Sequence, residues 1–501
     1  MNIATVQTTD AQEARLWHTF ARNVRDNVIA EAVTKALRVS AIVILARRLE
    51  PAAFGVFRIL LVVCVIIGLL NQAGIPEALI QRSDLRREHE ATAWWISIGL
   101  AHLNSLALYV IAPLAARTLA MPELTAGMRM LCIPLIIEGA AATADARFQR
   151  ELRFGALALA DILSESAFLV TALFVLKAGH PEASLPAALS ARCAIHGLTI
   201  RVAAGMPVIA PPKVEAARDF ARFASTAMGA QIICFLSANT DYLLVGRLLG
   251  STALGYYSIA WDLLRFIPDR LYRVAGRVSF PTFCRFKDDD RKLGEAYLRF
   301  FGYIARIVLP LIACLVIAAP EVFTGLYGAK WIPAVAPLRL LGIGLAIGGL
   351  NVGIGAVYYA KSRPALDFYL HGVRFLMLIA ACTAFARFGL RGVSAAMAVE
   401  EGIIGIAGGW GASKLIDLPY SKLALAAAPA FVLAGACAGA TFAAKMAVAA
   451  IRLHGAASLL LILPAPIAVF LWSEGVSLFA MARNSYDPSR SRPSPSDLAL
   501  E

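Results

Sequence analysis

The sequence predicts an all-α integral membrane protein with about fourteen transmembrane helices. Apolar side chains make up 59% of the 501 residues and charged side chains only 16%, against roughly 25% charged residues in an average soluble protein. The apolar residues occur in repeated long runs of spanning length, and the connections between these runs are short. The composition therefore argues against a soluble enzyme.

Fourteen apolar runs are long enough to cross a bilayer as helices. They lie at residues 27–47, 55–76, 91–116, 126–146, 154–177, 185–209, 220–245, 253–275, 297–319, 332–358, 365–386, 391–412, 424–446 and 456–480. The predicted domains are a cytoplasmic N-terminal segment (1–26), two six-helix bundles (27–209 and 210–412), two additional helices (413–482) and a disordered, Pro/Ser-rich cytoplasmic tail (483–501).

The charge distribution predicts the orientation in the membrane. The net charge is +13, but Lys and Arg fall between the apolar runs, so nucleic-acid binding is not indicated. Counted over alternate connections, one set holds 22 Lys and Arg and the other holds 10. Because cytoplasmic loops retain Lys and Arg, we expect a multi-pass protein of the bacterial inner membrane with both termini in the cytoplasm.

The cysteines and the N-terminus indicate neither a cofactor nor a cleaved leader. None of the eight cysteines forms a CxxC pair and most lie inside apolar runs, so we expect no metal site and no disulfide framework. The first 26 residues contain six charged side chains and no continuous apolar core, so we expect no signal peptide.

An internal repeat is visible at an offset of 200 residues. The segment 46–57 aligns with 246–257, with identical Arg, Leu, Ala and Gly at four positions, the last being Gly55 and Gly255. The offset contains six predicted helices, an even number, as a parallel repeat requires. Two six-helix bundles around a central cavity are a transporter plan.

The same segments resemble polysaccharide-transport (Wzx-type) flippases. The similar stretches are ARRLEPAAFG (46–55), AGIPEALIQR (73–82), NTDYLLVGRLLG (239–250), ALGYYSIA (253–260), RVSFP (277–281), GLYGAKW (325–331) and APLR (336–339). The chain departs from the usual Gly-Pro pair at Glu50 and Pro51. The resemblance implies the multidrug/oligosaccharidyl-lipid/polysaccharide exporter superfamily and alternating access, with a polyprenyl-pyrophosphate-linked oligosaccharide as cargo.

Charged side chains inside two predicted helices indicate a wet cavity, because such groups are costly when they face lipid. Glu31, Lys35 and Arg38 recur at i, i+4 and i+7 on one face of the first helix. A second stripe recurs at i, i+3, i+7 and i+11 of the eighth helix, namely Asp262, Arg265, Asp269 and Arg273.

Guanidinium groups bind phosphate oxygens bidentately, so we expect cations from both bundles to bind the cargo. The candidates are Lys35, Arg38, Arg58, Arg265, Arg270, Arg273, Arg306, Arg339 and Arg374. Snorkelling to the interface and interhelix pairing stay open as alternatives. Carboxylates in helices are candidates for coupling to a proton or a cation, namely Glu31, Asp161, Glu165, Asp241, Asp262 and Glu400. Asp161 and Glu165 repel each other if both are ionised, unless an Arg pairs with one of them.

Other patterns do not indicate catalysis. The DxD string 288–290 lies in a short basic loop with no domain around it. Gly344 with Gly348 and Gly405 with Gly409 have small-xxx-small spacing, which predicts close helix packing.

Two alternatives to a flippase remain. A cation-coupled drug exporter of the same superfamily favours an acidic or aromatic cavity, and a membrane-embedded polymerase or glycosyltransferase usually needs a large extramembrane loop. We therefore expect a transporter without covalent chemistry or cofactor. Its expected partners are membrane lipids and a polysaccharide polymerase with glycosyltransferases, for exopolysaccharide, capsule or O-antigen of lipopolysaccharide.

Overall fold

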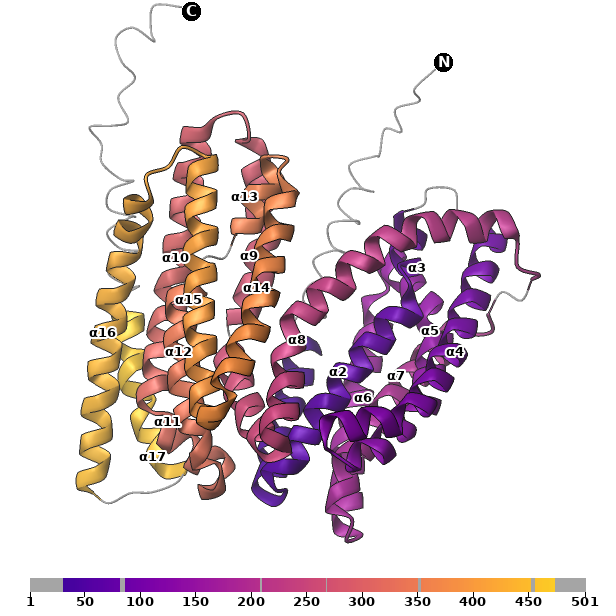
Figure 1. Cartoon of the computed structure of the whole chain (residues 1–501), viewed down its shortest axis with the longest axis horizontal. Helices are drawn as coiled ribbons and strands as arrows, with labels where there is room; N and C mark the ends of the chain where they lie inside the picture. The colour runs from indigo at the N-terminus through magenta and orange to yellow at the C-terminus, as the bar shows by residue number, and fades with distance from the viewer. Residues whose placement is uncertain are drawn as a thin grey trace, which may run out of the picture. The chain divides into compact units, whose positions relative to one another are not determined.

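The computed structural model describes residues 30–81, 86–207, 210–266, 268–349, 353–451 and 456–473. Within these ranges the regular elements are helices and no strand occurs (Figure 1). Eight described helical segments are long and apolar enough to cross a membrane. In lipid each backbone N–H and C=O group needs a hydrogen-bond partner within the protein, and a helix supplies these partners itself. The all-α integral membrane fold predicted from the sequence is confirmed.

The helices follow one another with short connections. Up to residue 265 they are a helix over 30–48, α2 (Pro51–Gln72), α3 (Ile75–Gln81), α4 (Arg87–Leu119), α5 (Glu123–Arg150), α6 (Phe154–Lys177), α7 (Pro181–Ala204) and α8 (Val214–Arg265). From residue 268 they are α9 (Pro268–Arg285), α10 (Asp290–Ile317), α11 (Ala319–Val322), a π-helix η1 (Phe323–Tyr327), a 3₁₀-helix η2 (Ala329–Ala334), α12 (Val335–Gly348), α13 (Ile354–Ala360), α14 (Pro364–Phe385), η3 (Ala386–Phe388), α15 (Gly389–Leu415), α16 (Tyr420–Ala450), α17 (Ala456–Ile462) and a stretch over 464–473.

Each predicted span has a helical counterpart, but the eighth, the tenth and the fourteenth are divided, the last at Leu463. The eighth span, 253–275, is wrong as one helix, because α8 ends at Arg265 and α9 begins at Pro268. Proline disfavours a helical residue before it and lacks the N–H that would continue the helix. The tenth span, 332–358, divides between α12 and α13, where Gly353 has φ 94°. The predicted N-terminal segment, the tail and the span ends 27–29 and 474–480 lie outside the described residues.

The chain divides into two compact units. The first comprises the residues up to Ser258 together with Arg374–Val393, and the second comprises Ile259–Val373 and the residues from Ser394. The predicted boundaries at 209/210 and 412/413 stay predictions. In the first unit α4 packs on α5, α5 on α7 and α6 on α7. Small residues permit this close packing, as at Gly197, where a Cβ would press on the backbone of Glu138 in α5.

The second unit packs around aromatic side chains and glycines. Phe283, Tyr297 and Phe301 belong to one buried cluster that joins α9 and α10 to α13 and α16. A Cβ on Gly348 of α12 would overlap the carbonyl oxygen of Glu401 in α15. The close packing predicted from the small-xxx-small spacing in this region is thereby confirmed.

The two copies of the internal repeat have the same local structure and contact each other. In each copy the break between two helical segments lies five residues before a glycine, Gly55 or Gly255. The residue at the break is Glu50, which is extended, in the first copy and Gly250, which is non-helical, in the second. A Cβ on Gly55 would overlap the carbonyl oxygen of Ser251, and a Cβ on Gly255 would overlap that of Pro51. Shifting the residue numbers of one contact by 200 gives the residues of the other contact. This is the pattern of a two-fold, self-complementary contact.

Candidate functional site

A buried carboxylate in the first unit is held by two guanidinium groups. Glu165 of α6 has only 4% of its side chain exposed. Arg38, from the helix over 30–48, donates to Oε1 of Glu165 from Nε at 3.0 Å and also from Nη2. Arg192 of α7 donates to the same oxygen from Nη1 at 3.1 Å. We call Arg38, Glu165 and Arg192 the arginine cluster.

The arginine cluster exists because helix packing takes Glu165 away from solvent. A buried carboxylate is costly unless it is paired and hydrogen-bonded, and α6 packs along α7, which supplies Arg192. The two arginine side chains stay partly exposed, at 40% for Arg38 and 28% for Arg192. Part of each guanidinium is therefore accessible to a further hydrogen-bond acceptor.

Further polar groups extend from the arginine cluster along α6 and α7. Asp161 lies one helical turn before Glu165, is 58% exposed, and its Oδ1 is 3.7 Å from Nε2 of His196. His196 in turn lies one turn after Arg192 and lines a small cavity together with Glu138 and Asp145. Asp161 thus lies near His196, whereas Glu165 is paired with two arginines, as the Arg-pairing alternative describes.

Two other predicted residues of the first unit lie near the repeat contact. The guanidinium of Arg58 lies over the ring of Tyr242, 4.6 Å from its centroid. Asp241 is buried and accepts a hydrogen bond of 3.0 Å from the Tyr257 hydroxyl. On the helix over 30–48, Glu31 is exposed and Lys35 half-buried.

The second unit carries predicted cations of its own. Arg265 stacks on Trp261 with 4.0 Å between guanidinium carbon and ring centroid. Arg339 is exposed and donates to the carbonyl of Val316 at 3.1 Å. Arg306 is half-buried, Asp262 is exposed and Glu400 is buried. Arg374, also half-buried, belongs to the first unit. The side chains of Arg270 and Arg273 lie outside the described part of the chain. Because the eighth span is broken, Asp262 and Arg265 do not share one helix with Asp269 and Arg273.

The DxD lookalike serves to begin a helix. Asp289 is the N-cap of α10 and accepts a hydrogen bond of 3.0 Å from the backbone N–H of Lys292. This hydrogen bond lowers the pKa of Asp289. Asp290 is paired with Lys361. The acidic residues of this loop therefore cap α10 and form ion pairs.

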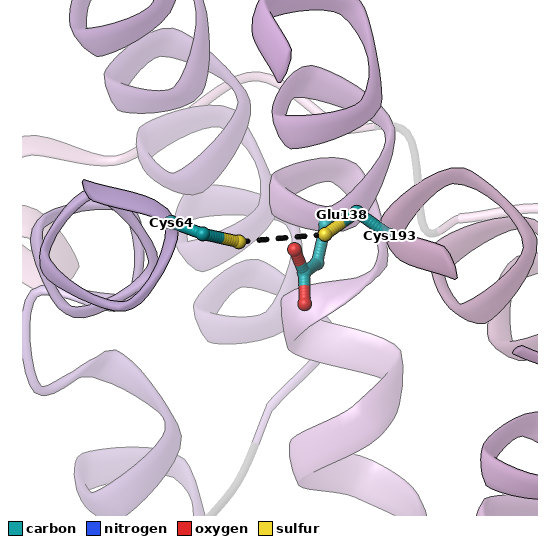
Figure 2. A group of neighbouring side chains, drawn as sticks. All are labelled: Cys64, Glu138 and Cys193. Atoms are coloured by element: carbon teal, nitrogen blue, oxygen red, sulfur yellow. Dashed lines mark hydrogen bonds between the residues drawn. The ribbon is translucent and has the colours of Figure 1, made fainter. Parts of the chain in front are cut away.

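Sequence reasoning missed Arg192 and one group of possible metal ligands. Arg192 is a charged residue inside a predicted span, the same signal that singled out Arg38. Cys64, Glu138 and Cys193 come from α2, α5 and α7 and converge in the first unit (Figure 2). The two cysteines are 129 positions apart, so no spacing motif could have indicated this group.

Comparisons with known proteins agree with this architecture. The sequence profile described as polysaccharide biosynthesis protein matches residues 44–336, more than half of the chain. The chain is 28% identical over 302 residues to the teichuronic acid biosynthesis protein TuaB of Bacillus subtilis, covering 59% of this chain and 62% of that protein. It is 23% identical over 366 residues to the lipopolysaccharide biosynthesis protein WzxC of Escherichia coli, covering 71% and 73%.

A solved structure shows the same fold. The lipid II flippase MurJ in an inward closed conformation superposes with a TM-score of 0.71 at 14% identity, covering 91% of this chain and 99% of MurJ. The fold is therefore that of a multi-pass, all-helical membrane transporter built from two bundles. With the profile match over more than half of its length, the chain belongs to the polysaccharide biosynthesis protein family.

Proposed function

We propose that this protein is a flippase that moves a polyprenyl-pyrophosphate-linked oligosaccharide across the bacterial inner membrane by alternating access. The step serves surface polysaccharide synthesis, as exopolysaccharide, capsule or O-antigen. Family membership supports the pathway, and the transporter fold supports translocation without covalent chemistry. Both termini are cytoplasmic in this proposal, and a polymerase and glycosyltransferases act on the same cargo.

The arginine cluster is the observation that carries the proposal. A guanidinium has five N–H donors, so the bonds from Arg38 to Glu165 use only part of its capacity. The exposed part of Arg38 and Arg192 can donate to a pyrophosphate, whose oxygens match the guanidinium fork. Glu165 holds both cations in place when no cargo is bound. Two partly exposed guanidinium groups favour an anionic cargo over a cationic drug.

The remaining charged candidates keep subordinate roles in the proposal. Arg58 and Arg265 each lie over an aromatic ring, which orients the guanidinium. For ion coupling, Asp161 is a better candidate than Glu165, because Asp161 is more exposed and its Oδ1 lies near a titratable histidine. Glu165 is held by two permanent cations, which favour its charged form.

A deletion strain tests the proposal. Lipid extracts are analysed by mass spectrometry for polyprenyl-pyrophosphate-linked oligosaccharide, and the strain is complemented with the intact gene or with Arg38→Ala, Arg192→Ala or Arg265→Ala. We expect cytoplasmic-side accumulation in the deletion strain, relief by the intact gene, and loss of surface polysaccharide in each variant at normal membrane abundance.

Arg201→Ala is the matched control. Arg201 also lies in α7 but donates to the carbonyl of Gly205 at the helix end, so this variant should complement fully. Accumulation of no lipid-linked oligosaccharide, with increased drug sensitivity instead, would support the drug exporter and refute the proposal. Full complementation by Arg38→Ala and Arg192→Ala would remove the arginine cluster from cargo binding.

A further inference from the structure

Three side chains that can ligate a metal converge inside the first unit. Cys64 and Cys193 are buried and Glu138 is half-buried, and one ligand atom of each lies within 4.8 Å of those of the other two. Figure 2 shows the two thiols facing each other from α2 and α7, with the Glu138 carboxylate of α5 beside them. None of these three residues belongs to the arginine cluster.

The spacing fits a tetrahedral ion. The two sulfur atoms are 3.4 Å apart. With zinc–sulfur bonds of about 2.3 Å, two thiolates on a tetrahedral zinc lie about 3.8 Å apart, a difference that small side-chain rotations accommodate. A disulfide needs about 2.0 Å between the sulfurs, so the thiols are closer to the zinc geometry than to the disulfide geometry.

The surrounding charge also fits a divalent cation. Two thiolates and one carboxylate carry three negative charges, and a Zn²⁺ ion leaves one. Arg192 is adjacent to Cys193 in sequence and interacts electrostatically with Cys193, Cys64 and Glu138. Its positive charge therefore acts both on Glu165, to which it donates, and on this group of ligands. A buried ionic group is tolerated where its charge is compensated in this way.

A further nitrogen donor lies on the cavity side of Glu138. Glu138 and His196 line the same small cavity, and Nδ1 of His196 is buried without a hydrogen-bond partner in the described structure. His196 lies three residues after Cys193, on the same face of α7. Either this nitrogen after a side-chain rotation, or a water in the cavity, completes four-fold coordination.

We propose that Cys64, Cys193 and Glu138 bind one Zn²⁺ ion that fastens α2, α5 and α7 together. Binding of Zn²⁺ forms two zinc–sulfur bonds and one zinc–oxygen bond, and the two thiol protons are released to water. No oxidant or reductant takes part. Because the three helices also position Arg192, the ion stabilises the framework of the first unit without contacting cargo.

The test uses the full-length protein purified in detergent without chelators and under reducing conditions. After equilibration with Zn²⁺ and removal of free metal, we expect about one zinc per chain by mass spectrometry of the elements and a higher thermal unfolding temperature than in the chelator-treated protein. Replacement by Co²⁺ should give the absorption of tetrahedral cobalt with thiolate ligands, a readout that needs no variant.

Two double variants test whether zinc binds at this site or at any pair of neighbouring cysteines. The double variant Cys64→Ser/Cys193→Ser should lose the zinc, and Glu138→Gln should bind it at least about tenfold more weakly. The control is Cys314→Ser/Cys437→Ser, because Cys314 and Cys437 also interact as a pair but belong to no three-ligand group in the described ranges. This control should retain the zinc.

Three results would overturn the proposal. The first is wild-type protein without bound zinc and without a cobalt–thiolate spectrum. The second is equal zinc content in the Cys64→Ser/Cys193→Ser variant, and the third is a Cys64–Cys193 disulfide in protein isolated without reductant. None of these results bears on the flipping assay, so the failure of this proposal is distinguishable from failure of the proposed function.

Discussion

The two copies of the repeat make the same contact with different chemistry. Gly55 and Gly255 each lie against the backbone at the start of the other copy's helix. The break before that helix is made by an extended Glu50 followed by Pro51 in the first copy, and by Gly250 with φ 85° in the second. The close contact is thus retained on both sides, while the means of ending the preceding helix differs.

The largest expected effect comes from filling the shared contact. Gly55→Ala and Gly255→Ala each place a methyl group on a backbone carbonyl oxygen, which cannot rotate away as a side chain can. We expect the free energy of unfolding to fall by about 3 kcal/mol in either variant, which is at the upper end for an overpacked site. Thermal unfolding of the detergent-solubilised protein measures this.

Gly68→Ala is the control for that prediction. Gly68 also lies in α2, and nothing lies within 4 Å of a Cβ built on it, so we expect no loss and a gain of up to about 1 kcal/mol from helix propensity. A loss at Gly68 as large as at Gly55 would show that α2 tolerates no side chain at any glycine. A loss of stability in only one of the Gly55→Ala and Gly255→Ala variants would show that the two copies are not equivalent.

The helix breaks should respond unequally to alanine. Gly250 has φ 85° and ψ 172°, a region that only glycine adopts readily, so Gly250→Ala should cost about 2 kcal/mol although its Cβ would meet nothing within 4 Å. Glu50 has φ −72° and ψ 153°, which any residue adopts, so Glu50→Ala should change stability by less than about 0.5 kcal/mol. Equal losses in the same unfolding measurement would contradict this difference.

The third prediction concerns a hydrogen bond that only the second copy has. Tyr257 donates to buried Asp241, whereas the equivalent positions of the first copy are Phe57 and Ala41. Tyr257→Phe should cost about 1.5 kcal/mol, because a buried carboxylate loses a donor. The double variant Asp241→Ala/Tyr257→Phe, which has the first copy's residues, should lose less than the sum of the single variants. Additive losses in this double-mutant cycle would show that the two side chains are not coupled.

The sequence predicted the fold well because apolar runs, loop charges and the repeat are properties of contiguous segments. It singled out Arg38 and Glu165 separately, since a charged residue inside an apolar run is visible without a structure. Their pairing with Arg192 was not predictable, because it depends on how α6 and α7 pack against the helix over 30–48. The convergence of Cys64 with Cys193 across 129 positions depends on the same packing.

Breaks inside apolar runs were underestimated for a related reason. Pro268 was placed in one continuous helix because the hydrophobic pattern continues across it, yet the backbone interrupts the helix there. Apolar periodicity reports which residues avoid water, whereas a missing N–H or a positive φ acts on the backbone alone. The stripe of charges proposed for the eighth span therefore divides between two helices.

The smallest expected effect on stability is at Arg58, where the second copy has Ser258. Arg58 lies over the Tyr242 ring at 4.6 Å, a contact worth about 0.5–1 kcal/mol at a partly exposed site. Arg58→Ser should therefore lower the free energy of unfolding by about that amount. If Arg58 also binds cargo, as proposed, surface polysaccharide should fall much further than stability does. Arg117→Ser, at the exposed end of α4, is the control and should change neither. Polysaccharide that falls only in proportion to protein abundance would make Arg58 a packing residue, and would leave the difference between Arg58 and Ser258 without a role in transport.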